Sequence, residues 1–267
     1  MEKTMWSEVI YNSGDTPLGH QHIFDLVNNK CSGIVLRGVL DSQSLSQCQD
    51  AIDEYRNRAE TSEYTNGSLT TIGPYLARNI ETPDVYFDRA NTTDELFPKK
   101  EFDLRAQVRE TLQKVFDFDS IRVANDNGYS YAPCVVRLHG DGVSNPLHND
   151  MIARDCNHTT LSLKKLVAQL SCVVCIQECD FGGELMHYRK VWKPEDEQYK
   201  IPRGLGYNHK VVEDVECWKF KPETGDVYLI NPTNYHSIEK VGGTERRTLG
   251  FFIGFYEDNL KNPVVWG

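Results

Sequence analysis

The chain has 267 residues and carries 39 acidic against 29 basic side chains, which gives a formal net charge of −10. This acidic balance argues against nucleic acid and anionic membrane surfaces as main partners. With 39% hydrophobic residues and no run of about 18 apolar residues, the sequence predicts one large domain, residues 1–267, without a membrane span. The N-terminus lacks the apolar segment of a secretory signal, so we expect a cytoplasmic protein with reduced cysteines.

The first part of the chain, to about residue 120, is predicted to contain helices and one strand. Residues 20–28 favour a short helix, and residues 32–40 favour a strand. Two longer helices are predicted to pack on the outside of the main sheet, one of them starting after Asp41 or Ser42. Their apolar side chains recur at helical spacing: Leu45, Cys48, Ile52 and Tyr55 in one, and Leu104, Val108, Leu112 and Val115 in the other. Residues 60–98 show no clear periodicity and are predicted to be a long loop, functional or partly mobile.

From residue 121 onward the pattern is mostly strands, and the catalytic core is expected in about residues 121–256. Turn residues separate nine stretches of strand character: 121–124, 131–139, 147–152, 165–179, 184–191, 217–220, 226–231, 236–241 and 246–256. Many short strands with turn signals predict a jelly-roll or cupin-like double sheet. The polar stretch 193–210 falls between core strands, and we predict that it forms a lid over a site.

The most informative pattern is His148-Asn149-Asp150, followed much later by His236. Side chains at positions i and i+2 of a strand share a face, so His148 and Asp150 can hold one ion while Asn149 faces away. Two histidines and one carboxylate are the ligand set that selects non-haem Fe(II) and leaves open coordination positions. Histidines that are merely hydrogen-bonded in a core or loop are the alternative. The surrounding pattern favours metal ligation, and hence a catalytic role, for His148, Asp150 and His236.

Between about Tyr129 and Phe255 the chain resembles the Fe(II)/2-oxoglutarate-dependent dioxygenases with a double-stranded β-helix core. The matching pieces follow the family's order: the HxD motif, a Gly-Gly-Glu-Leu step from Gly182, a Pro-x-x-Gly-Asp-Val-Tyr-Leu strand, the distal histidine, and an arginine ten residues after it. The closing stretch is similar to the small-molecule hydroxylase and halogenase branch. The resemblance implies a mainly β fold with flanking helices, Fe(II) as cofactor, and 2-oxoglutarate and dioxygen as co-substrates.

The resemblance also implies a site for the far carboxylate of 2-oxoglutarate. Arg246 is the arginine ten residues after His236; its planar fork suits a carboxylate, and Thr248 shares its strand face. Arg247 is the rival, because a shift of one residue in register would exchange the two faces. Tyr131 lies in a segment similar to one in plant-type members, where a tyrosine binds the same carboxylate. A tyrosine that only fills the core is an equal alternative.

Two other patterns have a structural role as the alternative to a functional one. Cys172, Cys175 and Cys179 have a spacing that suggests an iron–sulfur or zinc site. They lie in or just after an apolar strand pattern and no second cysteine pair follows, so buried thiols are the better prediction. His139 precedes His148 by nine residues and is predicted either to line the pocket or to end a strand.

With the resemblance, the sequence predicts an oxygenase that hydroxylates an unactivated C–H bond of a small molecule, an amino acid or a natural-product intermediate, and releases succinate and CO2. Desaturation, cyclisation and hydroxylation of a protein or peptide side chain need the same metal ligands and stay open. The related halogenases lack the HxD carboxylate, so Asp150 disfavours halogenation. A non-catalytic cupin-like binding protein would be indicated by loss of a ligand, and all three ligands are present.

Overall fold

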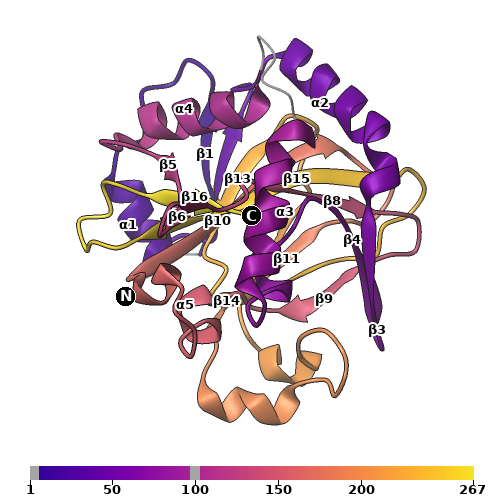
Figure 1. The fold of residues 1–267 in the computed structure, drawn as a ribbon. Coiled ribbons are helices and arrows are strands. Elements are labelled where there is room, and N and C mark those ends of the chain that lie inside the picture. The colour runs from indigo at the N-terminus through magenta and orange to yellow at the C-terminus, as the bar shows by residue number, and fades with distance from the viewer. Residues whose placement is uncertain (1–5, 97–102) are drawn as a thin grey trace.

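Two sheets dominate the computed structural model, which describes residues 6–96 and 103–267 (Figure 1). The larger sheet has ten strands within these residues, and the smaller sheet has four. In spatial order the larger sheet contains β1 (Val9–Asn12), β2 (Ile34–Arg37), β13 (Val227–Ile230), β10 (Ala168–Gln177), β15 (Arg246–Phe255), β8 (Val135–His139), β4 (Gly67–Ile72) and β3 (Glu60–Tyr64), with β16 (Val264–Trp266) beside β15 and β5 (Arg122–Val123) beside β16.

The smaller sheet completes a double-stranded β-helix. Its spatial order is β12 (Cys217–Phe220), β11 (Leu185–Val191), β14 (Asn234–Ile238) and β9 (Asn145–His148), and a separate ribbon pairs β6 (Asn125–Asp126) with β7 (Tyr129–Ser130). From β8 to β15 the chain passes back and forth between the sheets: β8, β10, β13 and β15 lie in the larger one, and β9, β11, β12 and β14 in the smaller one. This crossing confirms the predicted fold class.

Period-two alternation gives the larger sheet an apolar outer face and a partly polar inner face. The outer face shares one hydrophobic cluster with three helices: α1 (Gln21–Val27), α2 (Ser42–Glu54) and α4 (Leu104–Phe116). Asp41 caps α2 by accepting from the backbone N–H of Ser44 at 2.7 Å, as the sequence predicted. The two longer helices therefore cover the outside of the main sheet, as expected, and leave the inner face to the smaller sheet.

The predicted long loop over residues 60–98 is wrong for its described part. The chain there forms the β3–β4 hairpin, in which Tyr64 pairs with Gly67, and then α3 (Pro83–Leu96). Strand β4 is held by tertiary pairing with β8 at the edge of the larger sheet, and no local periodicity shows such a partner. The last two residues of the range, 97 and 98, lie outside the described residues.

Other boundaries also differ from the prediction. The strand expected over 147–152 is β9, which ends at His148, and a short helix, α5 (Ile152–Asp155), begins where the strand was expected to continue. Strand β8 starts at Val135, four residues after Tyr131. In the part of the chain that the structure describes, no helix is long and apolar enough to cross a membrane.

Candidate active site

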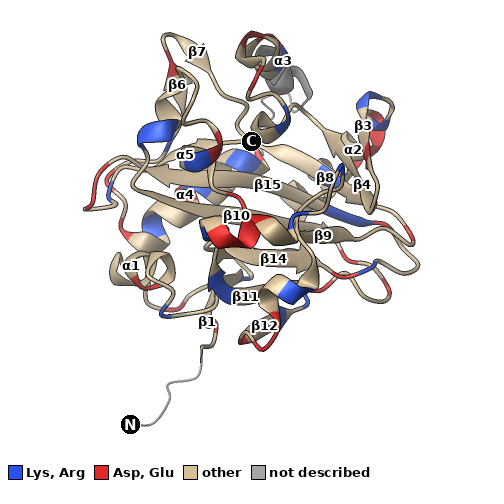
Figure 2. Ribbon diagram, turned by 90° about the horizontal axis from the view of Figure 1, so that it is seen from below, with Lys and Arg blue, Asp and Glu red and all other residues tan. Residues whose placement is uncertain are grey.

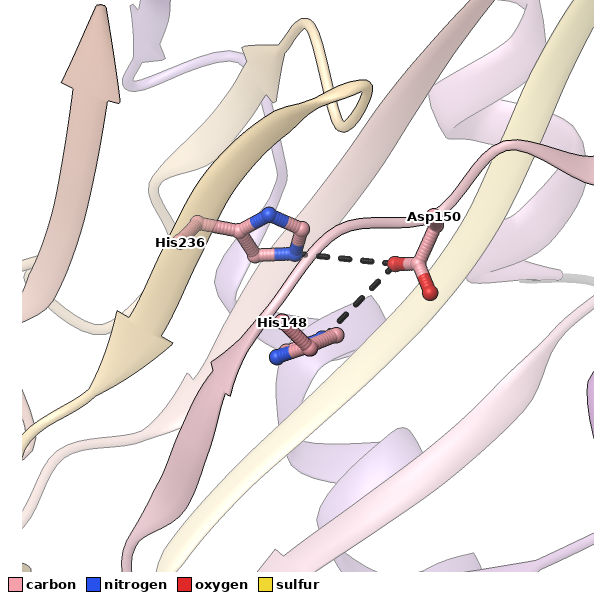
Figure 3. Close-up of side chains that lie close together, drawn as sticks. All are labelled: His148, Asp150 and His236. Carbon is pink, nitrogen blue, oxygen red and sulfur yellow. Dashed lines mark ion pairs between the residues drawn. The ribbon is translucent and has the colours of Figure 1, made fainter. Parts of the chain in front are cut away.

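The three predicted metal ligands meet at the inner edge of the smaller sheet (Figure 3). His148 at the end of β9 and His236 in β14 are direct cross-strand partners, and their ring centroids lie 4.2 Å apart. Asp150 follows the strand, where its backbone N–H donates to the carbonyl of Pro232 at 2.8 Å. One carboxylate oxygen of Asp150 lies 3.7 Å from Nε2 of His148 and 3.5 Å from Nε2 of His236. Three ligand atoms therefore face one point.

Backbone carbonyls fix which nitrogen each histidine offers to a metal. Nδ1 of His148 donates to the carbonyl of Pro146 at 2.7 Å, and Nδ1 of His236 donates to the carbonyl of Asn234 at 3.0 Å. A proton on Nδ1 leaves the lone pair on Nε2, and both Nε2 atoms face Asp150. Because each carbonyl belongs to the residue two positions before its histidine, local strand geometry provides this orientation.

The protonation states also suit a cation. Burial, reinforced by the neighbouring His236, lowers the pKa of His148 to about 4, so its ring is neutral near pH 7. Burial opposes ionisation of Asp150, but His148 and His236 outweigh it and hold the pKa of that carboxyl below its usual range. Two imidazoles and one carboxylate are the donor set that non-haem Fe(II) takes. Within residues 6–96 and 103–267, these are the residues whose metal-binding atoms gather closely, within 4.8 Å of one another.

A narrow inner cavity lies between the sheets beside His236. Its polar lining comes mainly from alternate residues of the larger sheet: Arg137 and His139 in β8, Ser171 in β10, Tyr228 in β13, and Arg246 and Thr248 in β15. Charged residues elsewhere lie mainly in helices and loops (Figure 2). Arg246, by contrast, is only 3% exposed, and its Nη2 donates to the hydroxyl of Tyr228 at 3.1 Å.

The structure separates Arg246 from its rival, Arg247. Arg247 points to the other face of β15, where it pairs with Asp53 at 2.8 Å and with Glu245 at 3.0 Å. Thr248 lies on the cavity side with Arg246, as the i and i+2 spacing predicts. The register that places Arg246 inward is therefore the one that the sequence favoured.

Tyr131 is not brought to this cavity. Its ring packs against Tyr86 and Phe87, and its hydroxyl donates to Asp126 at 2.5 Å. It belongs to a separate hydrophobic cluster with Trp266. The expected contact with the co-substrate is not supported, because β8 begins only after Tyr131; the core-packing alternative describes its surroundings.

A larger outer cavity of about 350 Å³ opens on the other side of the metal ligands. His148 and Asp150 form part of its wall, together with Tyr64, Leu69, Tyr75, Ala77, Arg78, Arg154, Asp155 and, from the predicted lid segment, Lys200, Leu205, Gly206 and Tyr207. Arg137 and Asn145 line both cavities and so mark where they meet.

Gly206 lets segment 193–210, the predicted lid, lie against the strand that carries His148. Its backbone has a φ of +73°, and a Cβ there would lie 1.9 Å from the carbonyl oxygen of Leu147, next to His148. The following N–H, of Tyr207, donates to that same carbonyl at 2.7 Å. Only glycine combines this backbone conformation with so close an approach, which places the segment directly beside the ligand strand.

The sequence did not identify Arg137, Ser171 and Tyr228 as residues of this cavity, and for His139 it left two roles open. The strand alternation in Val135-Val-Arg-Leu-His139 could have identified Arg137 and His139 as inward polar residues, since they share a face. Tyr228 alternates with buried Val227 and Leu229 in the same way. The three cysteines of the C-x2-C-x3-C pattern are buried free thiols, and burial raises the pKa of Cys172 above its ordinary range.

Solved structures with the same fold support this reading of the architecture. An N-substituted L-amino acid dioxygenase from Burkholderia ambifaria AMMD superposes with a TM-score of 0.59 at 15% identity, over 92% of this chain and 90% of that chain. The non-heme alpha-ketoglutarate-dependent carbocyclase SnoK from nogalamycin biosynthesis gives a TM-score of 0.51 at 14% identity, over 91% and 88%. At sequence identities this low, the superpositions show a common fold alone.

Comparison of sequences identifies relatives in addition to the shared fold. The leucinostatins biosynthesis cluster protein S of Purpureocillium lilacinum is 28% identical over 176 residues, which are 63% of this chain and 70% of that protein. The model of the carrier-protein-independent halogenase WelO5 family matches residues 15–266, nearly the whole chain. The chain therefore belongs to the family of the carrier-protein-independent halogenase WelO5.

Proposed function

We propose that this protein hydroxylates an unactivated C–H bond of a small molecule, with Fe(II) held by His148, Asp150 and His236 and with conversion of 2-oxoglutarate to succinate and CO2. The observation that carries the proposal is the carboxylate of Asp150, 3.7 and 3.5 Å from the two histidine Nε2 atoms. Family membership alone would suggest halogen transfer. A carboxylate at this place occupies the position that a halide ligand would need, so oxygen transfer is the better inference.

The residues of the chain bind and orient, while the bound iron with its co-substrates supplies the oxidising power. Arg246 is the buried cation that suits the distal carboxylate of 2-oxoglutarate, and Tyr228 fixes its guanidinium. On the other side, the outer cavity brings a substrate next to His148 and Asp150. Tyr207 of the lid segment is 5% exposed and helps to keep water from this side of the site.

The reaction type can be tested by the mass of the product. A panel of amino acids and their derivatives is first screened for compounds that stimulate succinate release, and the product of an accepted compound is then analysed by mass spectrometry with chloride present. We expect the gain of one oxygen atom and no chlorine isotope pattern. Asp150→Gly should lose most hydroxylation, because it removes a ligand. A chlorinated product from the unchanged protein would overturn the proposal.

The outer cavity also favours a substrate class, since Arg137 is the cation of its lining that has no acidic partner among the described residues. Three other cations there have acidic partners within 4.0 Å: Arg78 with Glu60, Arg154 with Asp155, and Lys200 with Glu197. Arg137 has no ion pair or hydrogen bond in the described part of the chain, and its Nε is buried without a partner. Arg137 is half-buried, and an unpaired guanidinium whose Nε has lost its contact with water is costly, so we infer that the substrate carries a carboxylate that Arg137 binds.

Arg137→Gln tests this inference on the compounds found by the screen. For a substrate with a carboxylate, KM should rise about 10- to 100-fold, as expected for loss of one charge-assisted hydrogen-bonded pair. For the corresponding carboxamide, KM should differ little between Arg137→Gln and the unchanged protein. Because Arg137 also lines the inner cavity, 2-oxoglutarate affinity is measured without substrate. A loss confined to 2-oxoglutarate would contradict the assignment to the substrate.

A further inference from the structure

His139 is a buried histidine whose ring nitrogens both lack a partner. It is 1% exposed, and neither Nδ1 nor Nε2 has a hydrogen bond within the described ranges. Other buried histidines differ: His187 meets the carbonyls of Ser32 and Asn231 through its two nitrogens, at 2.8 and 3.0 Å. Buried polar groups are normally paired, so an unpaired pair of ring nitrogens needs an explanation.

The position of His139 explains why its ring nitrogens are unpaired. In the antiparallel pairing of β8 with β15, His139 lies directly opposite Arg246, so the two side chains share the inner face of the sheet. Both line the inner cavity. Arg246 has an unpaired buried atom of its own, Nε, although its Nη2 is held by Tyr228. Two facing residues that line one small space between the sheets therefore carry nitrogens without a hydrogen-bond partner among the described residues.

The charges in this space suit an anion. Burial, followed by the nearby Arg246 and Arg137, lowers the pKa of His139 to about 3, so the ring is neutral near pH 7. A neutral imidazole carries one N–H donor and does not add a third positive charge beside the two arginines. No carboxylate is among the described residues that line the inner cavity, so none of them neutralises the guanidinium of Arg246.

We propose that His139 donates a hydrogen bond to the distal carboxylate of 2-oxoglutarate beside Arg246, and so is a positioning residue for the co-substrate. This inference rests on the proposed function, because it assumes that 2-oxoglutarate enters the inner cavity. Arg246 provides the charge and His139 adds a neutral donor from the neighbouring strand. The carboxylate would therefore be held by groups from two paired strands, β15 and β8.

The test compares two ligands that differ only at the far end. The Fe(II)-loaded protein, kept free of dioxygen, is titrated calorimetrically with 2-oxoglutarate and with 2-oxobutyrate, which has the same 2-oxo acid group and no distal carboxylate. His139→Leu should weaken 2-oxoglutarate binding about 10- to 100-fold and 2-oxobutyrate binding by less than about twofold. His139→Gln, which keeps a donor, should recover part of the loss. If the leucine variant does not fold, His139→Phe repeats the test with a ring and no nitrogen.

The possible outcomes separate this inference from the function on which it rests. Failure of the unchanged protein to bind 2-oxoglutarate would overturn the proposed function and this inference with it. Normal binding by the unchanged protein, with unchanged affinity in His139→Leu, would overturn this inference alone. An equal loss of affinity for 2-oxoglutarate and 2-oxobutyrate would also overturn this inference alone, because it would show that His139 acts only by supporting the fold.

Discussion

Replacing His236 with alanine is expected to abolish iron retention and 2-oxoglutarate turnover together. His236 supplies one of three ligands, and its Nε2 is held toward Asp150 by the bond from Nδ1 to the carbonyl of Asn234. Without it, His148 and Asp150 remain as two ligands on one side of the ion, too few to fix a facial triad. The measurements are iron content after gel filtration and succinate formation, which should fall to background.

A matched control shows that the loss is specific to the site. His158 is an exposed histidine that pairs with Glu81 at 2.8 Å, away from the three ligands. An exposed pair of this kind contributes little to stability, so His158→Ala should keep its iron and its turnover. Full activity of His236→Ala would refute the metal site, whereas loss of activity in both variants would indicate a general effect on the fold.

The second large effect is expected from Arg246→Ala, which should weaken 2-oxoglutarate binding on the order of 100-fold or more. Arg246 is 3% exposed in the inner cavity, so truncation removes a buried charge that water cannot replace. Titration of the Fe(II)-loaded protein with 2-oxoglutarate measures the change directly. The fold should survive, since the cavity that remains is polar and borders space already present.

Arg247→Ala is the matched control for this prediction. It removes the same charge from the adjacent position, but Arg247 faces Asp53 and Glu245 on the other side of β15. Its loss should change 2-oxoglutarate affinity by less than about threefold, the scale of partly exposed ion pairs. Equal effects of the two variants, or a larger effect at Arg247, would mean that the register of β15 is wrong.

The sequence predicted well those features that repeat locally. The strand period placed Arg246 and Thr248 on one face, and the spacing of Leu104 to Val115 located α4, because both follow from backbone geometry alone. The strand period also suggested that His148 and Asp150 share a face, but Asp150 lies beyond the end of β9 and is placed by the backbone bond to Pro232. His236 was proposed from the order of the motifs, and its role as a metal ligand stays a prediction.

Features that depend on a distant partner could not be predicted. Strand β4 exists because β8 offers it an edge, and Thr71 there pairs with Arg137, far along the chain. The contact of Arg246 with Tyr228 joins β15 to β13, which are not neighbours in the sheet. The choice between the two roles of Tyr131 could not be made from the sequence, because a similar local segment in other proteins does not fix where the following strand starts.

The walls of the two cavities come from different kinds of structure. The side chains of the inner cavity must therefore be kept for function, whereas those that surface segments contribute to the outer cavity can vary. The inner cavity is built from paired strands, where an altered side chain disturbs hydrogen-bonded neighbours on both sides. The outer cavity is bordered in part by the β3–β4 hairpin and by the lid segment, with residues such as Tyr64, Lys200 and Leu205. Surface segments of this kind accept exchange and insertion. Substitutions in the β3–β4 hairpin and the lid segment can therefore change the substrate while the use of 2-oxoglutarate continues. These two segments are the natural positions to vary in a mutant library.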